Sequence, residues 1–538
     1  MNMSFLKPQW LQAQKTDSEK KYMYLALALT FLAIAYLAIF ISNEYHTFHE
    51  YTDLAVIAYN VYFNVHYPQI ARGFQILSFG QHLSIDQFLL VIPAFMLHES
   101  SITLLFVQLL VVYSSGFAIF FITRDLTKNS KLAAIFTAIF LIYPGTLGQV
   151  VYDMHIEYSL TLFYLLTFYF YAKARKTPFL ISLALLLGSS EVAPIITIAL
   201  GIGLLLYEYK YNKGCVLTQS KKSYSIAIIT ASLVAVLFYG YVTSVLGSEY
   251  VTPLYAQIPK LLYVNGPQNS LLGYVVTAIH NPLGLIKADI SIYSSGYSAY
   301  LLYSLLLVFL GFGISLFFAF DVSILLILPW LSGVFVYRDP SFAIPISQNF
   351  GYVLSPVIVA SILGIIVSKE KGNWLSTKLR RIGMEKEAVI PVAAVVFALL
   401  LSVVSPLIYL YAVSPSSGVH SVNAAGLAHL ASLTSNKTAV QDYRELDSVI
   451  RAIPPNTSLM AEYFIAAHVI QRKLLEFPNP DNTLYFTPDY ILVDFNANVS
   501  LNACRSGFDN CSQVLSLVSN TPYAVYARNG TAVLYKRS

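Results

Sequence analysis

Long apolar segments alternate with short polar ones over the first 413 residues of the chain. The first of them, 22–42, has about the length that an α-helix needs to cross a bilayer. Ten more follow, and all eleven together predict a mainly α-helical, polytopic transmembrane bundle: 102–123, 132–148, 158–172, 178–187, 192–207, 223–246, 299–320, 323–336, 351–367 and 388–413. Segment 87–97 is apolar but too short to span, so we expect an interfacial or re-entrant helix there.

The composition agrees with a membrane protein. Hydrophobic residues make up 56% of the 538 positions and charged residues 11%, whereas soluble domains carry about 25% charged residues. The lipid bilayer is therefore the expected environment. A net charge of +5 is too small to suggest a nucleic-acid partner.

The positions of Lys and Arg predict the orientation, because cytoplasmic loops carry an excess of both. With the N-terminus in the cytoplasm, the inner segments hold 20 of these residues and the outer loops of the bundle hold 4. This predicts a multi-pass protein of the cell membrane, with a cytoplasmic segment at 1–21, a transmembrane domain at 22–413 and an extracellular domain at 414–538. The first external loop is 43–86, and helical spacing of apolar residues within 53–66 predicts a helix lying in the membrane interface.

The C-terminal region changes from a helical to a mixed pattern. Helices are expected near 441–452 and 464–471, and short strands at 458–461, 473–477 and 490–495. A hairpin is expected at 523–536, because Asn529-Gly530 is a typical two-residue hairpin turn. The region therefore predicts a small extracytoplasmic α/β domain.

Two further features of this region suit an extracellular location. Cys504 and Cys511 are too few for a zinc site, and a local disulfide in an oxidising compartment is the better interpretation. Glycosylation sequons begin at five positions, although an Asn/Ser/Thr-rich tail could contain them by chance: Asn436, Asn456, Asn498, Asn510 and Asn529.

The candidate chemistry centres on Asp153-Met154-His155-Ile156-Glu157, which lies between two apolar segments. Three ionisable side chains beside hydrocarbon are costly. The predicted orientation places them on the outer face, together with four other ionisable side chains: Asp53, His82, Asp86 and Glu191.

Four interpretations of these side chains remain open. They could supply a general base, hold a divalent metal that binds a phosphate, relay ions in a transporter, or cap helices. For Glu157 or Asp86 taken singly, we favour a capping role. For Asp153 and His155, opposite a loop that carries Asp53, we favour a functional role.

The order of several motifs resembles a known family. Gly80-Gln-His82-Leu-Ser84, Gln108-Leu-Leu and Asp153-Met-His155-Ile-Glu157 resemble elements of the predicted membrane proteins called domain of unknown function 2079. Its Asp-Leu-Gly element corresponds to Asp53-Leu-Ala, and its Lys-Glu-Asp element to Ser190-Glu191-Val192, which keeps only the acid. Patterns in the C-terminal domain also match, so the resemblance covers nearly the whole chain.

This resemblance implies a C-type glycosyltransferase (GT-C) fold. Such enzymes take a sugar from a polyprenyl-phosphate donor at the outer membrane face and carry an acid in the first external loop. Asp53 and Asp153 are then the implied catalytic carboxylates. The residues implied to bind the donor phosphate, or a divalent metal such as Mg²⁺ or Mn²⁺, are His155, Glu157, His82, Glu191 and Arg338.

The implied partners are a polyprenyl-phosphate-linked sugar and an unidentified acceptor. Two other functions remain open at this stage. The chain could be a non-enzymatic transporter or carrier, which would need ionisable groups near mid-membrane, or a structural cell-envelope protein.

Overall fold

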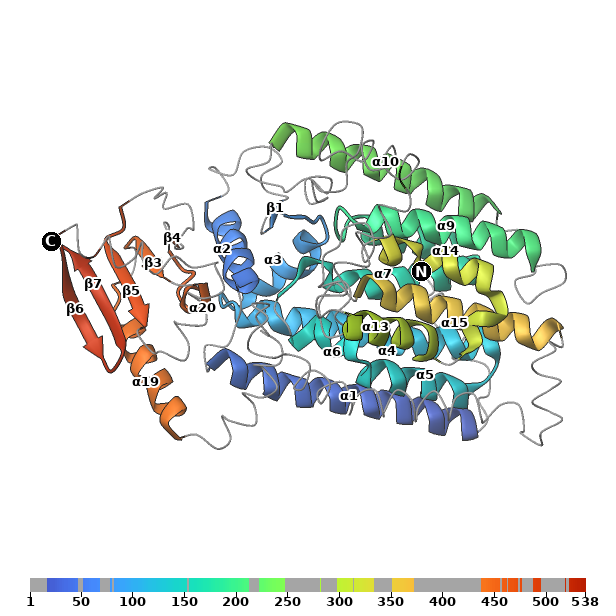
Figure 1. The fold of residues 1–538 in the computed structure, drawn as a ribbon, viewed down its shortest axis with the longest axis horizontal. Coiled ribbons are helices and arrows are strands. Elements are labelled where there is room, and N and C mark those ends of the chain that lie inside the picture. Colours follow the sequence, from blue (N-terminus) through green and yellow to red (C-terminus); the bar gives the residue numbers. More distant parts are fainter. Residues whose placement is uncertain are drawn as a thin grey trace, which may run out of the picture.

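The computed structural model describes most of the helical region and part of the C-terminal domain. The described residues are 17–46, 52–67, 78–79, 82–151, 154–211, 222–246, 281, 298–312, 314–332, 351–371, 437–454, 457–461, 463–472, 475–476, 487–494, 518 and 522–538. A helical bundle makes up most of the molecule, and a small sheet with flanking helices lies at one end of it (Figure 1). The predicted fold class, a helical membrane domain with a C-terminal α/β domain, is confirmed.

Among the described residues, five helices are long and apolar enough to cross a membrane, and a bent pair would make a sixth. The long helices occupy predicted spans and extend several of them by a turn: α1 (Asp17–His46), α4 (Ile102–Thr127), α9 (Ala193–Lys210), α10 (Lys222–Leu246) and α15 (Gly351–Lys371). The predicted span 388–413 lies outside the described residues. The count of about 11 therefore stays a prediction.

The bent pair corrects the predicted span 132–148. Helix α5 (Ser130–Ile142) ends before Tyr143, and α6 (Pro144–Val151) continues at an angle of 52°. Proline cannot donate a backbone hydrogen bond and disfavours helical geometry in the residue before it. Tyr143 accordingly has extended backbone angles, φ −67° and ψ 132°. The chain turns here, shortly before it reaches the Asp153–Glu157 segment.

Shorter helices fill the remaining predicted segments. They are α2 (Thr52–His66), α3 (Gln87–Leu97), α7 (Leu160–Ala172), α8 (Lys176–Leu187), α13 (Ser298–Leu310) and α14 (Phe320–Ser332). Segment 299–320 is also interrupted, because the 3₁₀ helix η8 (Ile314–Ala319) follows α13 after a turn. Helix α3 exposes Leu89, Met96 and Leu97, as expected of a helix at the membrane interface.

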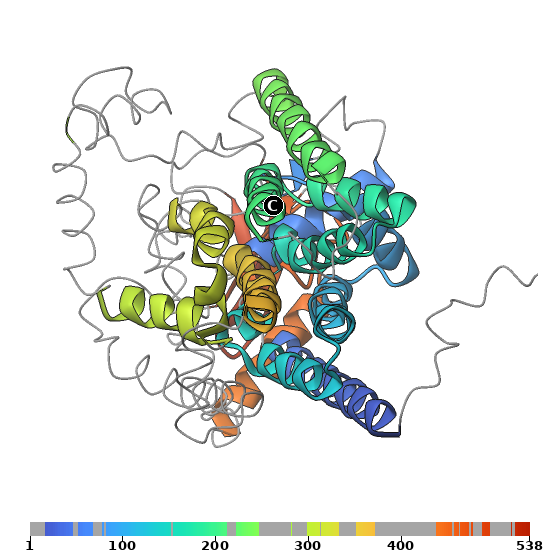
Figure 2. The same ribbon diagram turned by 90° about the vertical axis from the view of Figure 1, so that its right-hand side faces the viewer.

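Helix α15 lies near the centre of the bundle, and the view along the bundle shows other helices around it (Figure 2). The apolar 18-residue stretch of α15 is 89% buried, whereas the corresponding stretches of α1 and α10 are 28% buried. Packing is tight where Gly364 meets η8, since a Cβ on Gly364 would lie 1.9 Å from the carbonyl oxygen of Ser315. Helix α15 is therefore the packed core, and α1 and α10 are peripheral.

Charged side chains gather at the end of the bundle far from the C-terminal domain. Lys173 Nζ lies 2.8 Å from Asp125 Oδ2, and Arg124 pairs with the same carboxylate. At this end of the bundle, Lys210 Nζ of α9 also lies 2.6 Å from Asp321 Oδ2 of α14. These ion pairs of the bundle and the C-terminal domain thus lie at opposite ends, which is compatible with the predicted orientation. The side on which each terminus lies stays a prediction.

The C-terminal domain is built on a five-stranded sheet with the strand order β4-β3-β5-β7-β6. Strand β3 (Leu459–Ala461) pairs in parallel with β4 (Leu475–Glu476) and β5 (Tyr490–Asp494). Strands β6 (Tyr523–Asn529) and β7 (Ala532–Arg537) form the predicted antiparallel hairpin. Its turn contains Gly530 at φ 54°, a conformation that glycine adopts without strain. Helices α19 (Lys437–Arg451) and α20 (Tyr463–Ala466) complete the domain.

The C-terminal domain contacts the bundle through Ala467, Gln471 and Leu475. Ser101 Oγ donates to the carbonyl oxygen of Ala467. Gln471 Nε2 donates to the carbonyl oxygen of Glu99 at 2.7 Å. The backbone N–H of Leu475 donates to the Tyr59 hydroxyl of α2 at 3.2 Å. The C-terminal domain is therefore tied both to the start of α4 and to the helix of the first predicted external loop.

Candidate functional site

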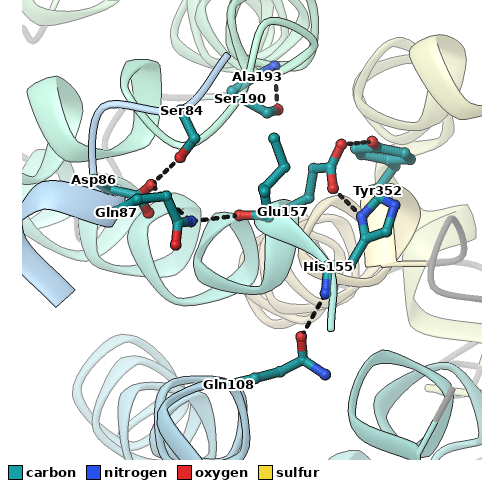
Figure 3. A network of polar contacts seen from close by, with 10 residues as sticks. Ser84, Asp86, Gln87, Gln108, His155, Glu157, Ser190, Ala193 and Tyr352 are labelled. Carbon is teal, nitrogen blue, oxygen red and sulfur yellow. Dashed lines mark hydrogen bonds and ion pairs between the residues drawn. The ribbon is translucent and has the colours of Figure 1, made fainter. Parts of the chain in front are cut away.

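The predicted motif forms a tight turn at the start of α7. Residues Ile156–Ser159 make the 3₁₀ helix η4, which runs directly into α7. The His155 imidazole Nδ1 pairs with Glu157 Oε2, and the two side chains are only 12% and 8% exposed. Tyr352 at the start of α15 donates its hydroxyl to Glu157 Oε1 at 2.6 Å (Figure 3). Both carboxylate oxygens of Glu157 are therefore engaged.

Helix α4 also contributes a residue, Gln108, to this cluster. Gln108 Oε1 accepts the backbone N–H of His155 at 2.8 Å. A carboxylate on one ring nitrogen of a histidine fixes the orientation and the tautomer of the ring. Glu157 therefore makes the His155 ring an oriented base, phosphate contact or metal ligand, and helices α4 and α15 hold the pair in place.

A second polar group lies on the other side of η4. Asp86 is 1% exposed, and its Oδ1 accepts from the Ser84 hydroxyl at 2.5 Å. Its Oδ2 accepts from the hydroxyl of Ser159, the last residue of η4. Gln87 Nε2 donates to the carbonyl oxygen of Ile156 at 3.3 Å (Figure 3). Asp86 and Gln87, at the start of α3, thus hold η4 at two points.

Burial changes the acidity of Asp86, which lies outside the candidate spans. Burial raises the pKa of its carboxyl to about 7, and the nearby charge of Glu157 acts in the same direction. The hydrogen bonds from Ser159 and Ser84 oppose the rise, because they favour the ionised form. A carboxyl with this pKa is partly protonated at neutral pH, which is a property of many catalytic sites.

The capping interpretation of Asp86 is wrong. Asp86 precedes α3, but its side chain makes no capping hydrogen bond to that helix. The carboxyl is taken up by the serine hydroxyls instead. Glu157 contributes both carboxylate oxygens to a side-chain cluster, with His155 and Tyr352.

The structure describes some of the other predicted site residues and not others. Asp53 is the second residue of α2, and His82 pairs with Phe79 in a short hairpin of β1 (Ser78–Phe79) and β2 (His82–Leu83). Glu191 is partly buried in the turn before α9, beside Ser190, whose hydroxyl accepts the backbone N–H of Ala193 at 3.3 Å. Eight predicted residues lie outside the described part of the chain: Asp153, Arg338, Cys504, Cys511, Asn436, Asn456, Asn498 and Asn510. A site shared by Asp53 and Asp153 therefore stays a prediction.

The remaining sequon is described. Asn529 ends β6 on the exposed side of the sheet, and its Nδ2 donates to the Ser448 hydroxyl of α19 at 2.7 Å. Its exposure leaves the predicted glycosylation sterically open, and the modification itself stays a prediction.

Sequence reasoning missed the partners of Asp86 and Glu157. Gln87 begins an apolar run and Ser159 lies within another. Tyr352 lies at the start of a predicted span, almost 200 positions after Glu157. The only signal in the sequence was a polar side chain at the edge of an apolar segment. Such a signal is common at helix ends and does not identify a partner.

The described residues do not supply a complete set of metal ligands. Within the described ranges, no group of three or more His, Cys, Asp or Glu side chains is arranged to hold a metal ion. His155 and Glu157 could supply two ligands, and Asp153, the acid of the same motif, lies outside those ranges. A divalent metal therefore stays a prediction.

Apolar helices of spanning length and a buried cluster of ionisable side chains at one end of the bundle define a polytopic membrane protein with a polar site. The chain belongs to the family described as Predicted membrane protein (DUF2079), whose family model matches residues 56–530. The predicted family membership is thereby confirmed. No curated protein matches the sequence.

Two solved structures are similar over most of the chain. ArnT from Cupriavidus metallidurans bound to undecaprenyl phosphate is 12% identical, with 94% of this chain and 97% of that chain covered and a TM-score of 0.44. ArnT from the same organism in the apo state is 14% identical, with 95% and 98% covered and a TM-score of 0.42. Both the identities and the TM-scores are low, so these similarities carry no argument about activity.

Proposed function

We propose that this membrane protein is a glycosyltransferase that moves a sugar from a polyprenyl-phosphate donor to an acceptor at the outer membrane face. The observation that carries the proposal is the buried pair of His155 and Glu157, held by Tyr352 at the end of the bundle nearest α2 and the C-terminal domain. The motif resemblance supplies the reaction class and the donor class. The proposed orientation puts the N-terminus in the cytoplasm and the C-terminal domain outside.

The proposed roles follow from the chemistry of the transfer. An acceptor hydroxyl that attacks an anomeric carbon needs a base within hydrogen-bond reach, and Asp53 in the first external loop has that role, with Asp153 as the second carboxylate. The leaving phosphate needs a positively charged or hydrogen-bonding partner. His155, oriented by Glu157, contacts the donor phosphate together with His82 and Arg338, and the Glu191 carboxylate acts there through a divalent metal.

A divalent cation, if bound, would be held by His155 and Glu157 and would neutralise charge on the leaving phosphate. The protein's own part is to orient the phosphate. The Glu157 carboxylate fixes the imidazole, and the Tyr352 hydroxyl and the Gln108 amide fix the turn that carries both.

The position of the cluster argues against a transporter. Ionisable groups that relay ions lie along the membrane interior. Asp86, by contrast, directly precedes α3, and Glu157 lies in η4, which runs into α7, so both lie at helix ends. An enzyme that works at one membrane face uses ionisable groups at such positions.

The bundle offers a matched control for testing the role of Glu157. Glu208 of α9 is also 8% exposed and also accepts a tyrosine hydroxyl at 2.6 Å, from Tyr171, but it lies at the opposite end of the bundle. Glu157→Gln and Glu208→Gln therefore remove the same charge from the same kind of pair. Only the first change disturbs the proposed site.

Membranes from expressing cells, which supply acceptors, are incubated with a panel of radiolabelled polyprenyl-phosphate hexoses. We expect Glu157→Gln to lower transfer by about 10–100-fold, because the His155 ring loses the carboxylate that orients it, and Glu208→Gln to leave it near wild type. Asp53→Asn removes the proposed base and should cost about 10²–10⁴-fold. Equal transfer by wild type, Glu157→Gln and Asp53→Asn would refute the proposed site, and absence of transfer from every donor would refute the proposed function.

A further inference from the structure

Helix α6 brings a buried amide to the place where α7 and α15 begin. Gln149 of α6 is 4% exposed, and its Nε2 donates to the carbonyl oxygen of Gly145 in the same helix at 3.2 Å. Because a carbonyl oxygen can only accept, this hydrogen bond fixes which way the amide points. Its Oε1 accepts from the hydroxyl of Thr161, the second residue of α7, at 3.2 Å. The Gln149 side chain therefore connects α6 to the start of α7.

The same amide lies against the first residue of α15, Gly351. A Cβ built on Gly351 would lie 2.7 Å from Gln149 Cδ and 2.9 Å from Gln149 Oε1. Any side chain at position 351 would therefore displace the amide, and glycine is the residue that allows so close an approach. Gln149 thus contacts α7 through a hydrogen bond and α15 through the backbone of its first turn.

Both contacts lie next to the Glu157 carboxylate. Tyr352, whose hydroxyl donates to Glu157 Oε1, directly follows Gly351, and Glu157 lies in η4, which runs into α7 shortly before Thr161. We propose that Gln149 is a positioning residue: it sets the distance between the starts of α7 and α15, and thereby holds the Tyr352 hydroxyl on the Glu157 carboxylate. This inference rests on the proposed function, because it concerns the same site.

Two substitutions at Thr161 separate positioning through the hydrogen bond from packing alone. Thr161→Ser keeps the hydroxyl that donates to Gln149 and loses a methyl group, whereas Thr161→Val keeps the volume and loses the hydroxyl. Because a displacement of about 1 Å can cost about 100-fold in rate, we expect Thr161→Val to lower transfer by about 10–100-fold. Thr161→Ser should stay near wild type. A site held by packing alone would show the reverse order.

A second pair of variants tests the contact with α15. Gly351→Ala forces a Cβ against the amide, and Gln149→Ala removes the amide, so each should lower transfer. In the double variant the new methyl group occupies the space that the amide has left. It should therefore lose no more than Gln149→Ala alone, whereas independent effects would multiply. Gly203→Ala is the control: its Cβ would lie 2.8 Å from Leu326 Cδ2, between α9 and α14, and transfer should stay near wild type.

A measurement on the purified protein decides the inference even if no donor is transferred. With 3-fluorotyrosine at position 352, the fluorine resonance reports the hydrogen bond of that hydroxyl. Glu157→Leu removes the acceptor and marks the resonance of a ring without this bond. Thr161→Val and Gly351→Ala should each move the resonance towards that position, and Thr161→Ser and Gly203→Ala should leave it in place.

The outcomes separate the inference from the proposed function. Size-exclusion chromatography selects folded protein for each variant, and if Gln149→Ala does not fold, Thr161→Val and Gly351→Ala still decide. A resonance that neither of these two variants moves would overturn the inference, even if the wild type transfers a sugar. A resonance that moves as expected, in a wild type that transfers no sugar, would support the positioning and refute only the proposed function.

Discussion

Acid should loosen the contact between the C-terminal domain and the bundle through His468. This residue follows α20, and its ring packs on the ring of Tyr45 in α1, with centroids 4.2 Å apart and planes 35° apart. Burial lowers the pKa of His468 to about 3, and the nearby His46 acts in the same direction. His468 is therefore neutral while the domain is docked.

The sign and size of the effect follow from linkage. A histidine freed from this contact regains an ordinary pKa of about 6.5, so the undocked state binds the proton more tightly. Docking is unaffected above that pH and weakens as the pH falls from about 6.5 towards 3. At pH 5 the loss is about 2 kcal/mol. This is an upper bound, because part of the ring remains accessible to water, which screens the charge.

The assay is hydrogen exchange of the peptide 463–472 in detergent-solubilised protein between pH 4.5 and 8, corrected for the intrinsic pH dependence of exchange. Protection should fall below pH 6.5 in the wild type. His468→Phe keeps an aromatic ring against Tyr45 and cannot be protonated, so its protection should not depend on pH. His98→Gln, which changes an exposed histidine at the end of α3, should behave as the wild type does. Acid loosening that survives in His468→Phe would refute this reasoning.

Three further predictions concern packing and topology. Gly364→Ala forces a Cβ against the backbone of η8 and should destabilise the bundle by about 1–3 kcal/mol, whereas Gly240→Ala, with nothing within 4 Å, should be neutral or stabilising; thermal unfolding in detergent compares the two. Protease added to intact cells should cut within 414–436, and protection of this segment until lysis would contradict the proposed orientation. Mass spectrometry of non-reduced peptides should find Cys504 linked to Cys511, and two free thiols in the native protein would exclude the disulfide.

The sequence by itself determined the elements that local rules govern. Apolar length predicted the helices, because a bilayer-spanning segment must satisfy its backbone hydrogen bonds internally. Helix α3 has the same limits as the predicted segment 87–97. The hairpin was also predictable from its turn residues, although the two-residue turn is Gly530-Thr531, one position later than the expected Asn529-Gly530, because Asn529 still pairs with Ala532.

Local pattern did not place every break in a helix. Segments 132–148 and 299–320 read as continuous apolar runs, yet each is interrupted. Pro144 was visible in the sequence as a cause of the first break. The second break is followed by η8, which packs against α15 at Gly364, and a contact of that kind cannot be read from hydrophobic residues alone.

Only the tertiary structure decided which polar side chains meet. Glu157 and Tyr352 are 195 positions apart, and Ser101 and Ala467 are 366 apart. Residue type and spacing restrict where a side chain can lie on its own helix, but a contact between helices depends on how every helix packs against its neighbours. For that reason Asp86 could be taken for a helix cap in the sequence, and its serine partners became visible only when α3, η4 and the end of α8 were placed together.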